Sequence, residues 1–359
     1  MVLKKIGILT SGGDCAGLNA IIRAATLHAS KHYGATVYGV KKGAHGFMKR
    51  PVDAEILDPD RLDYDLLRRG GTFLGTTNKG NPFHFPVGIE YKDLSQEFVD
   101  GMHLLGLDGI IGIGGDGSTA ILQKLCLKAG ISFVAIPKTI DDDMGATDHS
   151  VGFLTAVDTA TEALDKLHPT AASHDRVMVL EVMGRDAGHI ALNAGIAGGA
   201  DVILIPEIPY DLQAVVEHIQ GIMKVGRNFA LVVVAEAISK LNGEKAAIVD
   251  QEGQAARYAG MGQYIAKELS QHMEAEIRVT VLGHVQRGGQ PAAQDRILAA
   301  AFGVHAVDIL MQNKNDRLVI WRNREVTDVA ISEGIDQYRT VDVGGTLIKT
   351  AKGLGICFG

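Results

Sequence analysis

The sequence predicts an α/β fold with two sheet domains and a cleft between them. Two short runs, Ile110–Ile113 and Ile131–Ile136, are almost wholly apolar, as is typical of strands buried on both faces of a parallel sheet. The residues between them, 119–127, suit a crossover helix, which parallel strands require. The chain has 359 residues and therefore exceeds the usual size of a single hydrophobic core.

Polar clusters follow both runs at the point where each predicted strand ends. Gly114–Ser118 reads GGDGS after the first strand, and Pro137–Asp143 reads PKTIDDD after the second. Neighbouring parallel strands deliver their carboxyl ends to one edge of a sheet, and ligands bind at that edge in open α/β proteins. We therefore expect the two clusters to lie side by side at a ligand site.

The residue types in these clusters indicate phosphoryl transfer. Glycines allow backbone N–H groups to approach an oxyanion, and a helix starting after Ser118 would add its positive end. Asp116 beside phosphates implies a bridging cation such as Mg²⁺. Asp141 could then deprotonate an attacking hydroxyl, and Lys138 could neutralise negative charge on the phosphates. The alternative is a tight turn and a solvated loop, and the phosphate-binding fingerprint GxxxxGK[ST] does not occur.

The N-terminal third repeats this logic. A strand over Ile6–Thr10 leads into Ser11–Asp14 and a helix over Leu18–Ser30, so two glycine loops could close on one polyphosphate. Arg68–Lys79 is glycine-rich and is either a phosphate-side loop or a connector. The remaining elements expected before residue 109 are a strand at Val37–Val40, a loop at Gly80–Gly88 and a helix at Ser95–Leu105.

Four further apolar runs after residue 175 predict a second, smaller sheet. They are Val177–Val182, Asp201–Ile205, Phe229–Ala235 and Arg278–Leu282. The helices expected in this half are Thr155–Leu167, Gln251–Met273 and Asp295–Met311. The last stretch, Ile331–Gly359, is a weak α/β pattern to which the sequence assigns no chemistry.

Charged side chains gather at the ends of these later strands. They are Arg185, Glu236, His284 and Arg287 just after apolar runs, and Arg176 and Arg278 at the starts of two others. Arginine presents a planar fork to phosphate oxygens, and a carboxylate accepts hydrogen bonds from hydroxyls. Taken singly, each of these residues is more often a salt-bridged surface residue. Together they indicate a phosphotransferase acting on a phosphorylated, hydroxyl-rich small molecule.

Composition excludes several other classes. The net charge of −7 does not favour a nucleic-acid-binding face, and we expect no nucleic-acid partner. No apolar run is long enough to span a membrane, so no membrane association is expected. Three widely spaced cysteines fit a reducing cytoplasm and offer no zinc site. The sequence thus predicts a cytoplasmic globular protein.

Seven motifs resemble those of the phosphofructokinase family and occur in the family's order over about residues 4–310. They are ILTSGGD at Ile8–Asp14, GGTFLG at Gly70–Gly75, GGDGS at Gly114–Ser118, PKTIDDD at Pro137–Asp143, EVMGRDAGH at Glu181–His189, IAGGAD at Ile196–Asp201 and VLGHVQRGG at Val281–Gly289.

The resemblance implies two Rossmann-like three-layer domains with the active site in the cleft between them. The larger, phosphoryl-donor domain would contain residues 1–151 and about 286–336. The smaller, sugar-phosphate domain would contain about 152–285 and about 337–359. The resemblance also implies a homotetramer that uses Mg²⁺ and ATP to phosphorylate fructose 6-phosphate at its 1-hydroxyl.

Individual roles follow from the matching motifs. Asp141 resembles the catalytic base, Asp116 the Mg²⁺ ligand, and Arg176 and Arg278 a pair that reaches a neighbouring subunit's site. The catalytic group is Asp141, Arg185, Lys138 and Gly13. The donor group is Gly12, Gly13, Asn78, Lys79, Gly115, Asp116, Gly117 and Ser118. The acceptor group is Thr139, Asp141, Arg176, Met183, Gly184, Arg185, Glu236, Arg278, His284 and Arg287.

Two positions bear on the donor. Glycine at 117 resembles the ATP users of the family, whereas aspartate there resembles pyrophosphate users. Lys138 resembles pyrophosphate users and a subset of ATP users, and it would offset the arginine that many bacterial ATP enzymes carry where this chain has Asn78-Lys79. Asp142 replaces a usual asparagine, and its charge is expected to raise the pKa of Asp141.

The leading interpretation is an ATP-dependent 6-phosphofructokinase. The alternatives are a pyrophosphate-dependent enzyme, a non-catalytic sugar-phosphate-binding subunit, and a GGDG-loop kinase of NAD or lipid. Of the basic positions in the family's effector site, Arg23 and Arg227 are retained. Leu27, His168 and Val225 stand where cations are expected, so control by ADP or phosphoenolpyruvate does not carry over.

Overall fold

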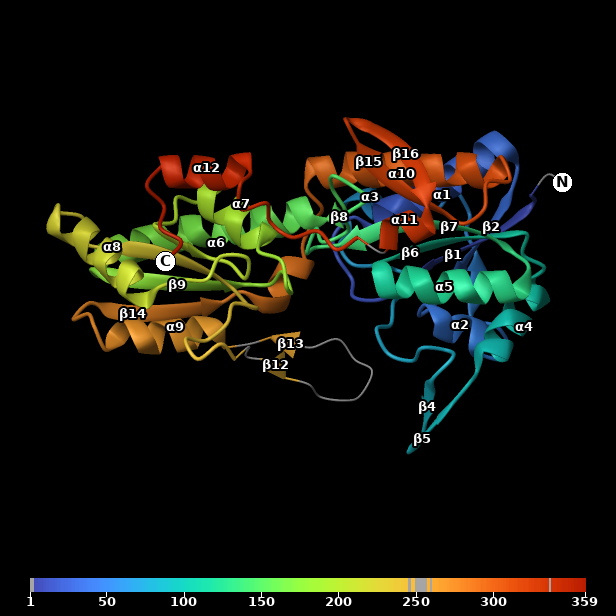
Figure 1. The fold of residues 1–359 in the computed structure, drawn as a ribbon. Helices are drawn as coiled ribbons and strands as arrows, with labels where there is room; N and C mark the ends of the chain where they lie inside the picture. Colours follow the sequence, from blue (N-terminus) through green and yellow to red (C-terminus); the bar gives the residue numbers. More distant parts are fainter. Residues whose placement is uncertain (1–2, 245–246, 249–256, 259, 336) are drawn as a thin grey trace. The chain divides into compact units, whose positions relative to one another are not determined.

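The computed structural model describes residues 3–244, 247–248, 257–258, 260–335 and 337–359. The chain divides into two compact units, each assembled from three segments (Figure 1). Unit 1 comprises Met1–Thr139, Met144–Leu154 and Arg287–Tyr338. Unit 2 comprises Ile140–Asp143, Thr155–Gln286 and Arg339–Gly359.

Unit 1 is built on one mixed sheet in the order β16-β15-β7-β6-β1-β2-β3, with β8 paired to β7. The two central strands that follow the expected pattern, β6 and β7, are parallel neighbours. Within the described strands of this sheet, only β3 and β16, at its two edges, run antiparallel to their neighbours. The strands are β1 Lys5–Thr10, β2 Thr36–Val40, β3 Ala54–Ile56, β6 Gly109–Gly114, β7 Ser132–Thr139, β8 Val151–Gly152, β15 Arg317–Arg322 and β16 Glu325–Ala330.

Helices pack on this sheet through buried apolar side chains. One core cluster joins Phe47, Phe98 and Phe133 with Leu122 and Leu318, from helices and from the central strands. The helices of unit 1 are α1 Leu18–Tyr33, α2 Ala44–Met48, α3 Tyr64–Arg68, α4 Ser95–Leu105, α5 Asp116–Ala129, α10 Ala293–Met311 and α11 Ile331–Ile335.

Two expectations for unit 1 are wrong in detail. The helix expected after Ser118 begins at Asp116, so GGDGS forms its N-terminal cap and first turn. The segment Gly80–Gly88 is not only a loop, because β4 Phe85–Val87 pairs with β5 Glu90–Lys92 in a small hairpin. Prolines at 82 and 86 suggested a loop, and Pro86 is tolerated in a two-stranded edge.

Unit 2 is built on a four-stranded parallel sheet in the order β10-β11-β9-β14. Its central strands β9 and β11 are buried along almost their whole length. The strands are β9 Arg176–Val182, β10 Val202–Leu204, β11 Ala230–Ala235 and β14 Glu276–Val281. The helices are α6 Phe153–Ser173, which starts in unit 1, α7 His189–Ala197, α8 Leu212–Lys224, α9 Met261–Ser270, α12 Thr346–Gly353 and the 3₁₀ segment η1 Gly283–Arg287.

The helix expected over Gln251–Met273 is wrong in its first part. Arg257–Tyr258 forms β13, which pairs with β12 Ala247–Ile248, and α9 begins only after Gly260, whose φ is +84°. Residues 251–256 and 259 of that expectation lie outside the described residues. A left-handed glycine at the start of a helix interrupts any earlier helical path.

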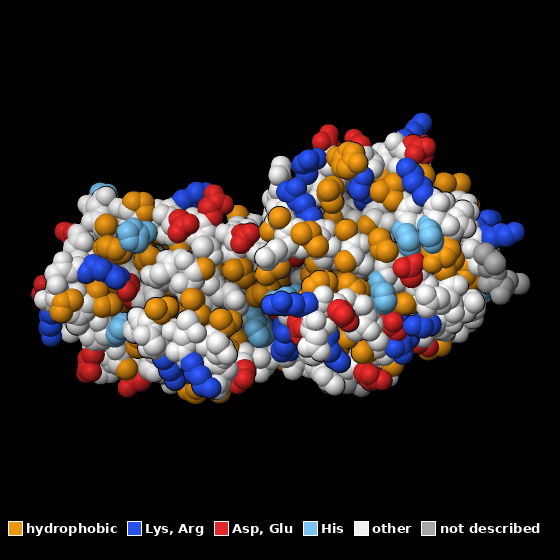
Figure 2. Space-filling model, turned by 90° about the horizontal axis from the view of Figure 1, so that it is seen from above, with side chains coloured by type: hydrophobic (Ala, Val, Ile, Leu, Met, Phe, Trp, Pro, Cys, Tyr) orange, Lys and Arg blue, Asp and Glu red, His pale blue; other side chains and the backbone are white. Residues whose placement is uncertain are grey.

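The surface carries both signs of charge. Lys/Arg and Asp/Glu side chains are interspersed over the face shown in Figure 2, with apolar side chains between them. Among the described helices, none combines the length and apolar character needed to cross a bilayer.

Candidate active site

The loop after β1 in unit 1 is held by backbone hydrogen bonds on two sides. Ser11 N–H donates to the carbonyl of Ile113 at the end of β6 (2.9 Å). Gly12 N–H donates to the carbonyl of Thr77 (2.9 Å), and Thr76 Oγ1 donates to the carbonyl of Gly12 (2.7 Å). The glycine-rich stretch Arg68–Lys79 therefore supports this loop from the side.

The second glycine loop lies against the first. β6 ends at Gly114, Gly115 caps α5, and Asp116 lies in the first helical turn. A Cβ atom on Gly12 would lie 3.2 Å from Ser118 Oγ, so the loops after β1 and β6 are in contact. The N–H groups at the start of α5 and a glycine-rich backbone form a surface suited to phosphate oxygens.

Gly117 is exposed and faces open space. A Cβ atom added there would meet no heavy atom of a described residue within 4 Å. Packing within the described chain therefore does not require glycine at position 117. Room for a bound ligand is another reason why this position would be glycine.

Two cations approach the loop after β1. The Lys138 side chain is 4% exposed, and its Nζ donates to the carbonyl of Gly13. Arg287 Nη1 donates to the carbonyl of Asp14 (3.0 Å) and would lie 2.7 Å from a Cβ atom on Gly13. A buried ammonium is costly unless it has anionic or carbonyl partners, and the carbonyl of Gly13 is one such partner for Lys138.

Asn78 and Lys79 are exposed at the end of the stretch Arg68–Lys79. Their contacts with a phosphoryl donor remain a prediction. Cys15 lies near the same loop, but burial raises the pKa of its thiol to about 12. Its Sγ donates to the carbonyl of Val151 (3.4 Å), and a protonated, buried thiol is not a nucleophile.

The carboxylates of unit 1 fit Mg²⁺ only together with a phosphate ligand. No group of three or more His, Cys, Asp or Glu side chains that could hold a metal ion occurs among the described residues. Magnesium commonly binds through one or two carboxylates with substrate phosphates and water. Asp116, in the first turn of α5 beside the glycine loops, matches that kind of donor set.

In unit 2, the loop Ile140–Asp143 carries the predicted base. Asp141 is 3% exposed, and the Arg185 Nε atom lies 3.5 Å from Asp141 Oδ2. Arg185 follows the end of β9 and has a φ of +50°, a left-handed conformation in a non-glycine residue. Such backbone strain is typical of functional turns. Asp141 and Arg185, predicted from separate motifs, are thus brought together.

Glu236 supports the turn that presents Arg185. Its Oε1 accepts hydrogen bonds from the N–H groups of Gly184 (3.3 Å) and Arg185 (3.0 Å). Burial raises the pKa of Glu236 to about 7, and the negative charge of Asp141 contributes in the same direction. Met183, Gly184, Arg185 and Glu236 therefore form one cluster at the carboxyl end of β9 and β11.

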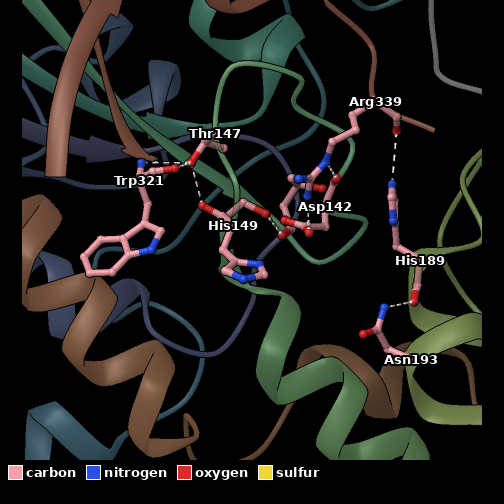
Figure 3. A network of polar contacts seen from close by, with 9 residues as sticks. Asp142, Thr147, His149, His189, Asn193, Trp321 and Arg339 are labelled. Carbon is pink, nitrogen blue, oxygen red and sulfur yellow. Dashed lines mark hydrogen bonds and ion pairs between the residues drawn. The ribbon is translucent and has the colours of Figure 1, made fainter. Parts of the chain in front are cut away.

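Asp142, the neighbour of the predicted base, has a cationic partner that the sequence analysis did not identify. The Asp142 carboxylate forms an ion pair with Arg339 (Figure 3). Arg339 belongs to Ile331–Gly359, the stretch to which the sequence assigns no chemistry. A single arginine 197 positions away from its partner gives no local signal by which sequence reasoning could have found it.

The remaining predicted acceptor residues lie elsewhere. Arg176 and Arg278 both pair with Glu276. Arg176 begins β9 and Met183 follows its end, which separates them by roughly 20 Å at strand geometry. His284 is exposed on η1, and Thr139 ends β7, where its carbonyl accepts a hydrogen bond from Ser150 Oγ (2.7 Å).

Two α/β units with mainly parallel sheets, paired glycine loops with a buried lysine, and a buried carboxylate beside an arginine define the class of α/β phosphotransferases. The sequence profile described as Phosphofructokinase matches residues 5–310. The chain belongs to the phosphofructokinase family.

Similar proteins agree with this assignment. The chain is 56% identical to "ATP-dependent 6-phosphofructokinase 1" of Synechocystis sp. and 53% identical to the protein of the same name of Nostoc sp., each match covering 99% of both chains. Phosphofructokinase from Pichia pastoris in the T-state superposes with a TM-score of 0.81 at 29% identity over 94% of this chain. The present chain covers 36% of that longer chain.

Proposed function

We propose that this protein is an ATP-dependent 6-phosphofructokinase, which converts ATP and fructose 6-phosphate into ADP and fructose 1,6-bisphosphate. The observation that carries the proposal is that Asp141 is a buried carboxylate beside Arg185. Asp141 also lies three positions after the buried Lys138 in the sequence. The proposal is supported by relatives of matching length that carry this name at up to 56% identity.

In the proposed reaction, Asp141 accepts the proton of the sugar 1-hydroxyl as its oxygen attacks the γ-phosphorus of ATP. The bond between the γ-phosphorus and the β–γ bridging oxygen breaks, and ADP leaves with the electron pair. Lys138, the N–H group of Gly13 and the start of α5 stabilise the charge on the transferring group. Mg²⁺ held by Asp116 would supply further charge neutralisation on the phosphates.

Acceptor recognition is proposed for the cluster Met183–Arg185 and Glu236, with Thr139, His284 and Arg287. The carboxylate of the buried Glu236 suits sugar hydroxyls, which donate hydrogen bonds to it, and Arg185 suits a developing phosphoryl charge. Arg176 lies roughly 20 Å along β9 from that cluster, and Arg278 lies beside Met178 on the neighbouring strand β14, roughly 15 Å from it. They would therefore serve the sugar-phosphate site of a neighbouring subunit in a cytoplasmic homotetramer.

A pyrophosphate-dependent enzyme is the second candidate, and Lys138 is the observation that favours it. Solved pyrophosphate-dependent phosphofructokinases from Marinobacter aquaeolei and Nitrosospira multiformis share the fold at 22% and 21% identity, with TM-scores of 0.77 and 0.78. At that identity the likeness extends to the fold alone. Gly117, with open space around it, favours the bulkier nucleotide.

The test is a coupled assay of the purified protein with fructose 6-phosphate and Mg²⁺, with either ATP or pyrophosphate as the only donor. We expect turnover with ATP and none above background with pyrophosphate. Turnover with pyrophosphate alone would replace the proposal by the second candidate. No turnover with either donor, from a protein that binds fructose 6-phosphate, would indicate a non-catalytic subunit.

Substitution Gly117→Asp tests donor choice directly. We expect kcat/KM for ATP to fall at least about 100-fold, since a carboxylate would repel the nucleotide phosphates, while KM for fructose 6-phosphate changes little. Gly353→Asp is the matched control, because a Cβ atom there also meets no described residue within 4 Å. Unchanged ATP kinetics in Gly117→Asp would show that this position does not set the donor.

A further inference from the structure

We infer that Arg339 is a positioning residue that clamps the loop Ile140–Asp143 and so holds the carboxylate of Asp141 in its reactive position. The inference rests on the proposed function for its kinetic consequence. The clamp itself is a structural property that can be measured in the resting protein.

The loop needs such a clamp. Asp141, Asp142 and Asp143 are consecutive, and they are only 3%, 3% and 6% exposed. Asp142 also has a φ of +54°, a left-handed conformation that a non-glycine residue keeps only when its surroundings hold it there. Repulsion among buried carboxylates and backbone strain would both drive the loop away from this shape unless a cation compensates.

Arg339 both compensates the carboxylate charge and holds the strained backbone, through contacts with Asp142 and Asp143. One guanidinium nitrogen, Nη2, bonds the Asp142 carboxylate, and Nε donates to the Asp142 carbonyl (3.0 Å). The backbone N–H of Arg339 donates to the carbonyl of Asp143 (2.7 Å). One residue therefore fixes the side chain and the backbone of Asp142 together with the backbone of the residue after it. A planar guanidinium can bond in this way, whereas an ammonium lacks the fixed fork.

The clamp is anchored in turn to the start of α7. The Nε2 atom of His189, the first residue of α7, lies 3.3 Å from the carbonyl of Arg339, as Figure 3 shows. Two residues further on, Val341 N–H donates to Glu207 Oε1 (2.8 Å), which also accepts the N–H of Gly188 (2.9 Å). The segment that carries Arg339 is thus tied to the start of α7 directly through His189 and indirectly through Glu207.

The charges of Arg339 and Asp142 predict how substitutions of the two residues should combine. Removing Arg339 alone leaves the buried Asp142 carboxylate without its guanidinium, and breaking a buried pair in this way is strongly unfavourable. Replacing Asp142 by asparagine removes the charge that Arg339 compensates, and asparagine also tolerates a positive φ. The loss caused by Arg339→Gln should therefore be smaller in an Asp142→Asn background.

The experiment is a double-mutant cycle of Arg339→Gln and Asp142→Asn, with Arg339→Lys as the conservative variant. We expect Arg339→Gln to lower kcat by about 10- to 100-fold through misplacement of the base, with KM for ATP and for fructose 6-phosphate changing less than about threefold. Adding Asp142→Asn should recover at least about fivefold of kcat. Lys352→Gln removes the same charge from exposed α12 and should leave kcat unchanged.

Amide hydrogen exchange supplies the readout that does not depend on activity. In ligand-free protein, peptides covering Ile140–Asp143 should exchange at least about tenfold faster in Arg339→Gln than in the wild type or in Lys352→Gln. Unchanged exchange there, or an unchanged kcat in Arg339→Gln, would overturn the inference. If Arg339→Gln shows the faster exchange but the wild type has no phosphofructokinase turnover, the proposed function is wrong and the inference about Arg339 is still supported.

Discussion

Asp141 is the residue on which the chemistry depends, and its surroundings separate catalysis from binding. It is buried beside Arg185, yet the turn that presents Arg185 is supported by Glu236. Substitution Asp141→Ala should therefore lower kcat about 10²- to 10⁴-fold, the usual contribution of a general base, and leave the affinity for fructose 6-phosphate nearly intact. Steady-state kinetics and calorimetric titration of the sugar phosphate measure the two effects.

The exposed Asp165, on α6, supplies a control for that substitution, since Asp165→Ala removes the same charge from the helix surface. Its kinetics should match those of the wild type. A loss of sugar-phosphate affinity with unchanged turnover in Asp141→Ala would contradict the role of Asp141 as the base.

Glu236 makes stability depend on pH. Its pKa in the folded protein is about 7, above the ordinary value of 4.5, so the protonated carboxyl favours the folded state. This contribution is fully present below pH 4.5 and is lost as pH rises through 7, a change of about 3 kcal/mol in the free energy of unfolding. We expect Glu236→Gln to lack this component in urea unfolding measured at pH 5 and pH 8.

Exposed Glu97→Gln should retain the pH dependence of the wild type. An equal pH dependence in Glu236→Gln and the wild type would mean that burial does not shift the titration of Glu236 as described.

Residue patterns in the sequence predicted the parts of the site that follow apolar runs directly. Asp116, Lys138 and Asp141 are of this kind, because the end of a parallel strand fixes where the next residues lie. Arg339 is of the other kind. Its partner is 197 positions away, and only the folded chain brings the two together.

At the scale of elements, glycines on helix surfaces behave in opposite ways according to what lies against them. Gly101 in α4 would place a Cβ atom 2.1 Å from the carbonyl oxygen of Phe47, whereas Gly221 in α8 would meet no described residue within 4 Å. Gly101→Ala should destabilise the protein by about 1–3 kcal/mol through overpacking. Gly221→Ala should stabilise it by about 0.5–1 kcal/mol through helix propensity.

Thermal unfolding of the two variants beside the wild type measures the difference. Melting temperatures that shift in the same direction would contradict the close packing of α2 against α4. Because both substitutions raise intrinsic helix propensity equally, each variant is the control for the other.

Apolar runs predicted β1, β2, β6 and β7 and the four-stranded sheet of unit 2, because burial leaves a distinctive composition, whereas β3, β8, β15 and β16 were not predicted. Helices were less well predicted where the pattern continued past a change of backbone direction. The expected helix over Gln251–Met273 is cut at Gly260, whose φ is +84°. Amphipathic periodicity does not register a single left-handed residue, and it gave no sign of the β4–β5 hairpin either.

At the scale of the whole molecule, Arg176 and Arg278 lie far from the cluster around Arg185 within one chain. If they complete a neighbouring subunit's site, two inactive variants should complement each other. Mixing Asp141→Ala with Arg278→Ala under conditions that exchange subunits should restore turnover to at least about tenfold above either variant alone. The coupled assay measures the recovery.

A mixture of Asp141→Ala with Arg185→Ala is the control, since both substitutions lie in the same cluster and every mixed site would lack one of the two. No recovery is expected there. Equal behaviour of the two mixtures would show that Arg278 acts within its own chain.

Unit 1 is assembled from three separate segments of the chain, so its strands are synthesised at different times. The edge of β7 at Val134–Ala135 is paired by Arg317–Leu318 of β15, which the ribosome adds only after the whole parallel sheet of unit 2. At about 5–20 residues per second, that edge waits on the order of ten seconds or more for its partner strand. An unpaired apolar edge invites association with other chains. The nascent protein is therefore expected to depend on chaperones most strongly while unit 2 is being translated.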